Sequence, residues 1–259
     1  TQEYLALFYA ALVRIGEPVI EELVTGLPMT HYLDEARRKR LAERLTGLHP
    51  VRGGQVVEVR RVTVLPQPMG AFLEQLGLCM DGRLDPKTSQ RLTDKASCIL
   101  SIDPGFYSTD YVLIRHNVLR DRSSGTSTIA VSAILDEVRK RIQRQFPFLR
   151  VSRERLESAL QDRSQVVHFG SVEVPFASFL TQVSEDLGGQ LCTELLESLR
   201  GESETVDIVL LAGGGRSLLE HSMRAAWPKA VWLEIKNPQR ANARGFLARA
   251  RAQAQAAVA

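Results

Sequence analysis

The sequence predicts an α/β protein of two similar lobes, the first of them incomplete. Segments with the 3.6-residue period of helices alternate along the chain with short apolar runs typical of buried strands. The order of these segments in the first part of the chain recurs in the second. An apolar hairpin around Asp103 opens the second series and has no counterpart in the first.

The composition is that of an ordinary globular protein. The 259 residues are 44% hydrophobic and 24% charged, enough for one large domain or two small ones. A net charge of +3 does not indicate nucleic-acid binding by itself, and no apolar run reaches the roughly 18 residues of a membrane span. Three separated cysteines in apolar surroundings predict a reduced, cytoplasmic protein, and five scattered histidines predict no zinc site.

The first series begins with an amphipathic helix and ends at a polar stretch, 81–96, expected to be a surface connection. Its basic run, Arg37–Arg40, more often marks a solvated helix face than a nucleic-acid site. Gly53-Gly54 is expected to start a hairpin. The expected elements are helix 1–16, strand 19–26, helix 33–45, strands within 51–65 and helix 68–80.

The second series contains the most apolar strands of the chain. A long helix is expected to start in Ser123–Ser127 and to stop at Phe146-Pro147, because proline breaks a helix. The strand at 206–212 runs straight into three glycines. The expected elements are hairpin 99–114, strand 118–122, a helix to about 145, helix 153–160, strands 166–174, helix 176–199, strand 206–212, helix 217–226, strand 231–235 and a helix from about 240.

The turn after Asp103 carries groups that suit phosphate. One carboxylate, bare backbone N–H groups and hydroxyls make a phosphate cradle with a place for a magnesium ion. Gly105 allows the backbone to approach phosphates closely. The donors would be Phe106, Tyr107, Ser108 and Thr109. An ordinary hairpin turn remains the alternative, since Asp, Gly and Ser favour turns.

The repeated order predicts the domain boundaries. Residues 1–97 with 236–259 would form the first lobe and 98–235 the second, with an insertion at about 147–203. Ligands of open α/β sheets bind at the carboxyl ends of strands. Because Gln67, Asp103 and Gly213 follow strands in this way, a nucleotide cleft between the lobes is expected.

Several stretches together resemble the actin-like ATPase superfamily, whose fold is ribonuclease H-like. The stretch Asn237–Phe246 is similar to the final helix of plasmid-segregating bacterial actins of the ParM/StbA type, including the actin-like protein D of PRTRC systems. Gly26-Leu-Pro28 is also typical of that branch. The stretches are Gln67–Ala71, Asp103–Asp110, Leu211–Ser217 and Asn237–Phe246. The family's first phosphate loop is not in this sequence.

The resemblance implies roles for these residues. Asp103 would hold Mg²⁺ through water, and Gln67 would orient the attacking water by geometry, since glutamine is a poor base. The glycines Gly213, Gly214 and Gly215 would pack under the ribose and adenine of ATP or ADP. A helix N-terminal residue at 67 and a tight strand-to-helix turn at 213–215 are the structural alternatives.

Three further residues are candidates for the nucleotide site. Gly125 and Thr126, at the expected helix start, would touch the ribose or form a plain N-cap. Arg216 would stack on adenine or point to solvent.

The leading functional hypothesis is an actin-like ATPase that polymerises to segregate plasmid or other DNA. Its partners would be copies of itself and a DNA-binding adaptor, with only indirect contact to nucleic acid and none to a membrane. One alternative is a non-enzymatic interaction module, either a nucleotide-binding pseudo-ATPase or a DNA-associated structural protein that uses Arg37–Arg40 and Arg139–Arg141. A less favoured alternative is a small-molecule kinase of the same superfamily.

Overall fold

The computed structural model describes residues 2–51, 53–199, 202 and 206–256. The chain divides into two compact units, residues 1–85 with 242–259 and residues 86–241. Each unit is described by itself. The lobe boundaries and the insertion expected from the sequence stay predictions, and part of the end of segment 147–203 lies outside the described residues.

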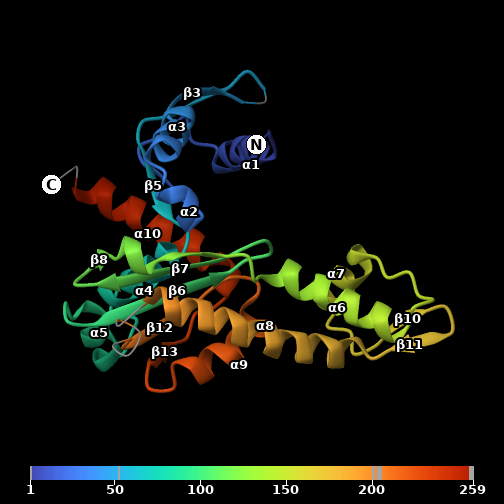
Figure 1. Ribbon diagram of the computed structural model, residues 1–259. Coiled ribbons are helices and arrows are strands. Elements are labelled where there is room, and N and C mark those ends of the chain that lie inside the picture. Colours follow the sequence, from blue (N-terminus) through green and yellow to red (C-terminus); the bar gives the residue numbers. More distant parts are fainter. Residues whose placement is uncertain (1, 52, 200–201, 203–205, 257–259) are drawn as a thin grey trace. The chain divides into compact units, whose positions relative to one another are not determined.

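The first unit joins two small sheets to four helices and the C-terminal helix (Figure 1). One sheet has the order β1-β4-β3, and the other pairs β2 with β5 in parallel. Its elements are α1 (Gln2–Ile15), β1 (Val19–Ile20), β2 (Leu23–Leu27), α2 (Met29–Tyr32), α3 (Glu35–Leu45), β3 (Gly47–Pro50), β4 (Val56–Val59), β5 (Val62–Pro66), α4 (Met69–Met80) and α10 (Ala241–Ala256).

The core of the first unit explains its sequence pattern. Phe8 and Leu12 of α1 pack with Leu45 of α3 and with Val57 and Val59 of β4. These side chains recur at helical or alternating spacing, so each element presents one apolar side to the cluster.

The expected strand 19–26 is two strands that pair in different sheets. The break falls at Glu21 and Glu22. Arg60 Nη1 lies 2.5 Å from Glu21 Oε1, and Arg61 Nε lies 3.0 Å from Glu22 Oε2. These ion pairs hold the corner where the chain leaves β1 and enters β2. The hairpin at Gly53-Gly54 is confirmed, since β3 and β4 pair antiparallel and both glycines have positive φ.

The second unit is built on a six-stranded mixed sheet of order β13-β12-β6-β7-β8, with β9 also paired to β7. Strands β12, β13 and β6 are parallel, and β6 and β7 form a long antiparallel hairpin. Its elements are α5 (Pro86–Thr93), β6 (Cys98–Pro104), β7 (Thr109–Arg115), β8 (Val118–Leu119), β9 (Gly125–Ser127), α6 (Val131–Gln145), α7 (Arg153–Gln161), β10 (Val167–Phe169), β11 (Val172–Val174), α8 (Phe176–Leu199), β12 (Ile208–Leu211), α9 (Arg216–Ala226) and β13 (Val231–Leu233), with 3-10 turns at Asp121–Ser123 and Pro238–Arg240.

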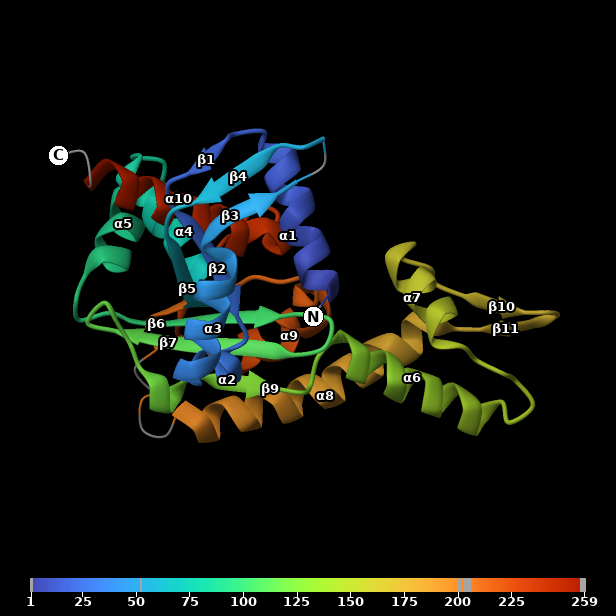
Figure 2. The same ribbon diagram turned by 90° about the horizontal axis from the view of Figure 1, so that it is seen from above.

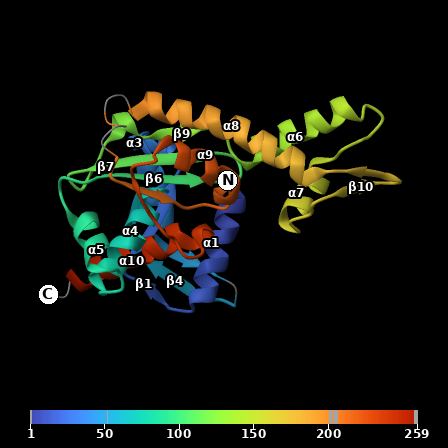
Figure 3. The ribbon, with the colours of Figure 1, turned by 90° about the horizontal axis from the view of Figure 1, so that it is seen from below.

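Helices cover the sheet of the second unit and extend past it. Helix α8 packs beside α9 (Figure 3) and beside α6. Figure 2 shows that α6 extends beyond the end of the sheet, on the side where α7 and the β10–β11 hairpin also lie. One apolar core, from Leu100 in β6 to Leu195 in α8, runs through the sheet and these helices.

Two sequence expectations for the second unit are wrong. The polar stretch 81–96 is not a surface loop throughout, because it contains helix α5, which begins at Pro86 and fully buries Leu92, although the division between the two compact units does fall within it. The long helix begins at Val131 rather than in Ser123–Ser127, because residues 125–127 form β9 against β7. Tertiary contacts of these short polar segments, which periodicity does not reveal, override the local pattern.

Candidate functional site

The turn of the β6–β7 hairpin is held by its own backbone. Asp103 is the cross-strand partner of Asp110, and Pro104 that of Thr109. The Gly105 amide donates to the Ser108 carbonyl at 2.8 Å and closes the turn. Tyr107 at its tip is 77% exposed. The hairpin predicted around Asp103 is therefore present.

The hydroxyls of this turn have partners within the protein. Ser108 Oγ donates to Asp110 Oδ2 at 2.9 Å, and Thr126 Oγ1 donates to Asp110 Oδ1 at 2.5 Å. Thr109 Oγ1 is buried and donates to the Ile129 carbonyl at 2.6 Å. In this geometry the hydroxyls fix the shape of the turn, with the buried Asp110 carboxylate at their centre.

The same turn is tied to the start of α6. The amides of Val131 and Ser132 donate to the carbonyls of Gly105 and Phe106 at 3.3 and 2.8 Å. The first amides of a helix have no partner within the helix, and Ala130 supplies no side-chain cap here. The turn therefore caps α6 through its backbone, which couples its position to that helix.

The glycine loop after β12 lies directly against the Asp103 turn. Gly213 has φ +75°, and a Cβ atom there would overlap the Pro104 carbonyl oxygen and lie 2.5 Å from Asp103 Oδ1. The Gly215 amide donates to the Pro104 carbonyl at 2.9 Å, and the Gly213 amide donates to the Pro238 carbonyl at 3.1 Å. Only glycine fits at 213, for conformation and for space.

Gly214 is different, because it is exposed and a Cβ atom there would make only ordinary contacts. The three atoms nearest to that Cβ position belong to the Gln239 side chain, at 3.4 Å and beyond. Gly214 and Gly215 line a cavity of about 400 Å³ together with Gly105 and Phe106 of the Asp103 turn. The two glycine-bearing turns predicted from the sequence thus share one hollow of the second unit.

Helix α7 and the residues after it contribute much of the remaining wall. Glu157, Gln161 and Arg163 supply polar groups, and Leu160 and Leu218 supply apolar ones. Sequence reasoning missed these residues and Gln239. Helix α7 was expected as an ordinary short helix, and no spacing in the sequence relates residue 157 to residue 214.

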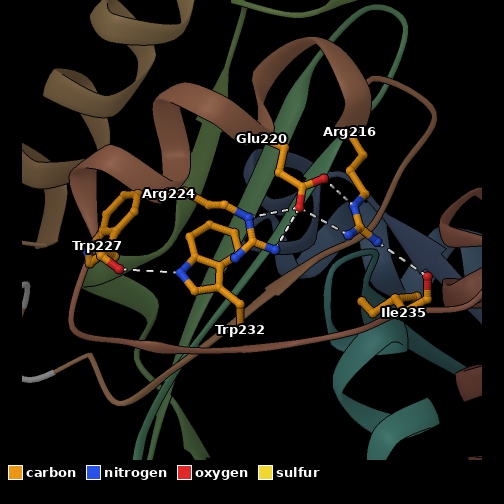
Figure 4. A network of polar contacts seen from close by, with 6 residues as sticks. All are labelled: Arg216, Glu220, Arg224, Trp227, Trp232 and Ile235. Carbon is orange, nitrogen blue, oxygen red and sulfur yellow. Dashed lines mark hydrogen bonds and ion pairs between the residues drawn. The ribbon is translucent and has the colours of Figure 1, made fainter.

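Arg216 is held in a network at the start of α9 (Figure 4). Its Nε lies 2.9 Å from Glu220 Oε2, and its Nη1 donates to the Ile235 carbonyl at 3.3 Å. Arg224 Nη2 lies 2.7 Å from Glu220 Oε1, and its guanidinium stacks 4.6 Å from the Trp232 ring centroid. Hydrogen bonds from Arg216, assisted by Arg224, lower the pKa of the Glu220 carboxyl. The sequence left open whether Arg216 points to solvent, and its side chain is 21% exposed.

Gly125 and Thr126 are in β9 and not at the start of a helix. A Cβ atom on Gly125 would lie 2.6 Å from the Tyr111 hydroxyl oxygen, so close strand packing explains this glycine. Thr126 bonds to Asp110 across the sheet. A role for either at the ribose stays a prediction.

Gln67 lies in the first unit, at the end of β5 and just before α4. Its amide donates to the Leu27 carbonyl at 2.9 Å. A Cβ atom on Gly26 would lie 2.9 Å from Gln67 Cγ and from the Phe246 ring. The half-buried glutamine side chain therefore passes close to β2, on the side where Phe246 of α10 also lies.

The described residues contain no preformed metal cage. Across the described part of the chain, no three His, Cys, Asp or Glu side chains are grouped so as to hold a metal ion. Mg²⁺ keeps several waters and is often bound by one or two carboxylates plus phosphates. Asp103 would therefore be one ligand of an ion that phosphate and water also hold.

None of the helices that the structure describes combines the length and apolarity needed to cross a bilayer.

Comparisons with known proteins agree with this architecture. Residues 1–70 match the family "Actin like proteins N terminal domain", and residues 101–225 match "Archaeal actin homologue MreB-like, C-terminal". No curated protein sequence matches the chain.

Solved structures extend the match to nearly all of the chain. Ta0583, an archaeal actin homologue, superposes with a TM-score of 0.75 at 22% identity, over 98% of this chain and 76% of that one. Ta0583 in complex with ADP gives a TM-score of 0.74, over 98% and 78%. A ParM from a 15-stranded filament of Clostridium botulinum gives 0.71 at 20% identity, over 97% and 74%. The chain therefore has the actin-like α/β fold.

Proposed function

We propose that this chain is an actin-like ATPase that binds ATP with Mg²⁺ and assembles into filaments in the cytoplasm to segregate plasmid or other DNA. The observation that carries the proposal is the shared hollow of the second unit, where the Asp103 turn and the Gly213–Gly215 loop lie against each other. The fold supports it, as do the ADP complex of Ta0583 and the ParM filament.

The hollow suits a nucleoside. Gly214 adds no side chain to the wall, and Leu160 and Leu218 offer apolar surface for a base. Glu157 and Gln161 offer acceptors and donors for hydroxyl groups. Mixed apolar walls with a few polar groups are typical of small-molecule sites.

The Asp103 turn suits the phosphates. Its backbone is fixed at both ends, by the Gly105–Ser108 bond and by its bonds to α6. A rigid turn needs little rearrangement when it receives a charged group, which favours electrostatic stabilisation. Magnesium, when bound, would neutralise phosphate charge beside Asp103. Gln67 would orient the water.

Contact with DNA is proposed to be indirect, through an adaptor. The run at 139–141 lies on α6, where Lys140 and Arg141 pair with Glu137 and Arg139 with Asp136. Arg141 also pairs with Asp186 of α8. Cations neutralised in this way attract phosphate weakly, so this face does not favour direct binding.

The test is assembly of the purified full chain. With ATP and Mg²⁺ we expect a rise in light scattering, pelleting at high speed, filaments by electron microscopy and release of phosphate, all weaker with ADP. If the chain neither assembles nor releases phosphate, the proposal is contradicted. Nucleotide binding without hydrolysis would favour the pseudo-ATPase, and ADP release that requires a small-molecule acceptor would favour the kinase.

A further inference from the structure

Helix α4 begins without a side-chain cap of its own. Its N-cap residue is Pro68, which cannot supply one. The second amide of the helix, that of Gly70, donates to the Gln67 carbonyl at 3.0 Å. The next, that of Ala71, donates to Asn242 Oδ1 at 3.1 Å, a side chain 171 positions later in the chain. Asn242 of α10 thus caps α4 from another helix.

The two helices meet backbone to backbone at this point. A Cβ atom on Gly70 would overlap the backbone of Asn242, and one on Gly245 would overlap the Gly70 carbonyl oxygen. Arg244 of α10 also pairs with Glu74 of α4, whose side chain is 9% exposed. Contacts this close leave no room for sliding, so the position of Asn242 fixes the start of α4.

Gln67 is the residue directly before this fixed turn. Phe246, one helical turn after Asn242, lies against Gly26 together with Gln67 Cγ. The Gln67 carbonyl is thus bonded to the turn that Asn242 caps, and Gln67 Cγ and the Phe246 ring both lie beside Gly26. Asn242 and Phe246 both belong to α10.

We propose that Asn242, supported by Phe246, is the positioning residue for Gln67: it sets the direction of the Gln67 side-chain amide by capping α4. The role of Gln67 toward water rests on the proposed function. The positioning of its side chain does not, and it can be measured without nucleotide.

The experiment compares Asn242→Ala with Asn242→Asp in the full chain. Asp keeps an acceptor for the Ala71 amide and Ala does not. Hydrogen exchange follows the Ala71 amide, and ¹⁵N NMR follows the Gln67 side-chain amide, assigned by its loss in Gln67→Glu. Arg249→Ala, at an exposed position of the same helix, is the matched control.

In Asn242→Ala we expect Ala71 to exchange at least tenfold faster and the Gln67 side-chain signals to shift or broaden. Asn242→Asp and Arg249→Ala should leave both as in the wild type. Phe246→Leu should shift the Gln67 signals while Ala71 stays protected, because it removes the ring and not the cap.

The proposal is overturned if the Gln67 signals are unchanged in Asn242→Ala, or if Asn242→Asp is as disruptive as Asn242→Ala. Where ATP is hydrolysed, kcat of Asn242→Ala should fall at least tenfold with KM within twofold. If the NMR result holds and no variant or wild type hydrolyses ATP, the proposed function fails and the positioning role stands.

Discussion

Asp103 and Asp110 lie directly opposite each other across the β6–β7 hairpin. They differ in surroundings, because Asp110 is 2% exposed and accepts two hydroxyl hydrogen bonds, whereas Asp103 is partly exposed beside Gly213. The Asp110 carboxylate holds the turn together, and the Asp103 carboxylate lies beside the glycine loop.

Removal of the Asp110 carboxylate should therefore destabilise the protein. Asp110→Ala takes away the acceptor of both the Ser108 and Thr126 hydroxyls, and we expect a loss of about 2–4 kcal/mol in the free energy of unfolding. Asp103→Asn should cost less than about 1 kcal/mol, because that side chain is partly solvated. Urea denaturation followed by circular dichroism measures both, and equal losses would contradict the assignment.

Neighbouring glycines of α8 should respond oppositely to alanine. A Cβ atom on Gly188 would overlap the Ser222 hydroxyl of α9, whereas one on Gly189 meets nothing within 4 Å. Gly188→Ala should destabilise by about 1–3 kcal/mol, because α8 and α9 must separate. Gly189→Ala should stabilise by about 0.5–1 kcal/mol through helix propensity. The melting temperatures of the two variants measure both effects. A Gly188→Ala protein as stable as the wild type would contradict the close packing of α8 against α9.

The Glu220 network should contribute stability only where its carboxylate is charged. Arg216 and Arg224 lower the pKa of Glu220 in the folded protein. A depressed pKa adds stability that is fully present above the unfolded value, near 4.3, and is lost as the pH falls through the folded value. Glu220→Gln should therefore cost roughly 1–2 kcal/mol at pH 7 and much less once the pH has fallen below the lowered pKa of the folded protein. A loss that is independent of pH would show that packing, and not charge, is responsible.

The cysteines should differ in reactivity. Burial raises the pKa of the Cys192 thiol to about 11, so roughly one molecule in a thousand carries the thiolate at pH 8. Cys79 is less buried than Cys98 or Cys192. With iodoacetamide at pH 8, Cys79 should be alkylated at least tenfold faster than Cys192 in the folded protein. Similar rates, measured by peptide mass spectrometry, would contradict this.

The elements that the sequence predicted well are those with long, regular apolar patterns. The β6–β7 hairpin, strand β12 with its glycines and helices α1, α3, α4, α8 and α9 follow from periodicity and from turn residues. Segments stabilised by distant partners were missed. Strand β9 depends on Asp110 and Tyr111, and helix α5 on the burial of Leu92.

The sequence predicted the glycine-bearing turns of the candidate site, but it did not predict the side chains that line the rest of the cavity. Gly105 and Gly213 stand out because turns that carry them follow apolar strands. Glu157 and Gln161 reach the same cavity only through the fold of the chain between α6 and α8. The cap from Asn242 to Ala71 joins residues too far apart in the chain for local reasoning to find.

The most direct measurement is binding of Mg²⁺-ATP to the full chain by isothermal titration calorimetry, with Gly214→Leu as the test variant. Gly214 is exposed and lines the cavity, and the atoms nearest to a Cβ atom there are in ordinary contact at 3.4 Å and beyond, so we expect a leucine at 214 to obstruct the cavity without disturbing the fold. We predict saturable binding to the wild type and to Gly189→Ala. Gly214→Leu should bind at least tenfold more weakly with an unchanged melting temperature. Equal affinity of Gly214→Leu and the wild type, or no binding to either, would contradict a nucleotide site in this hollow.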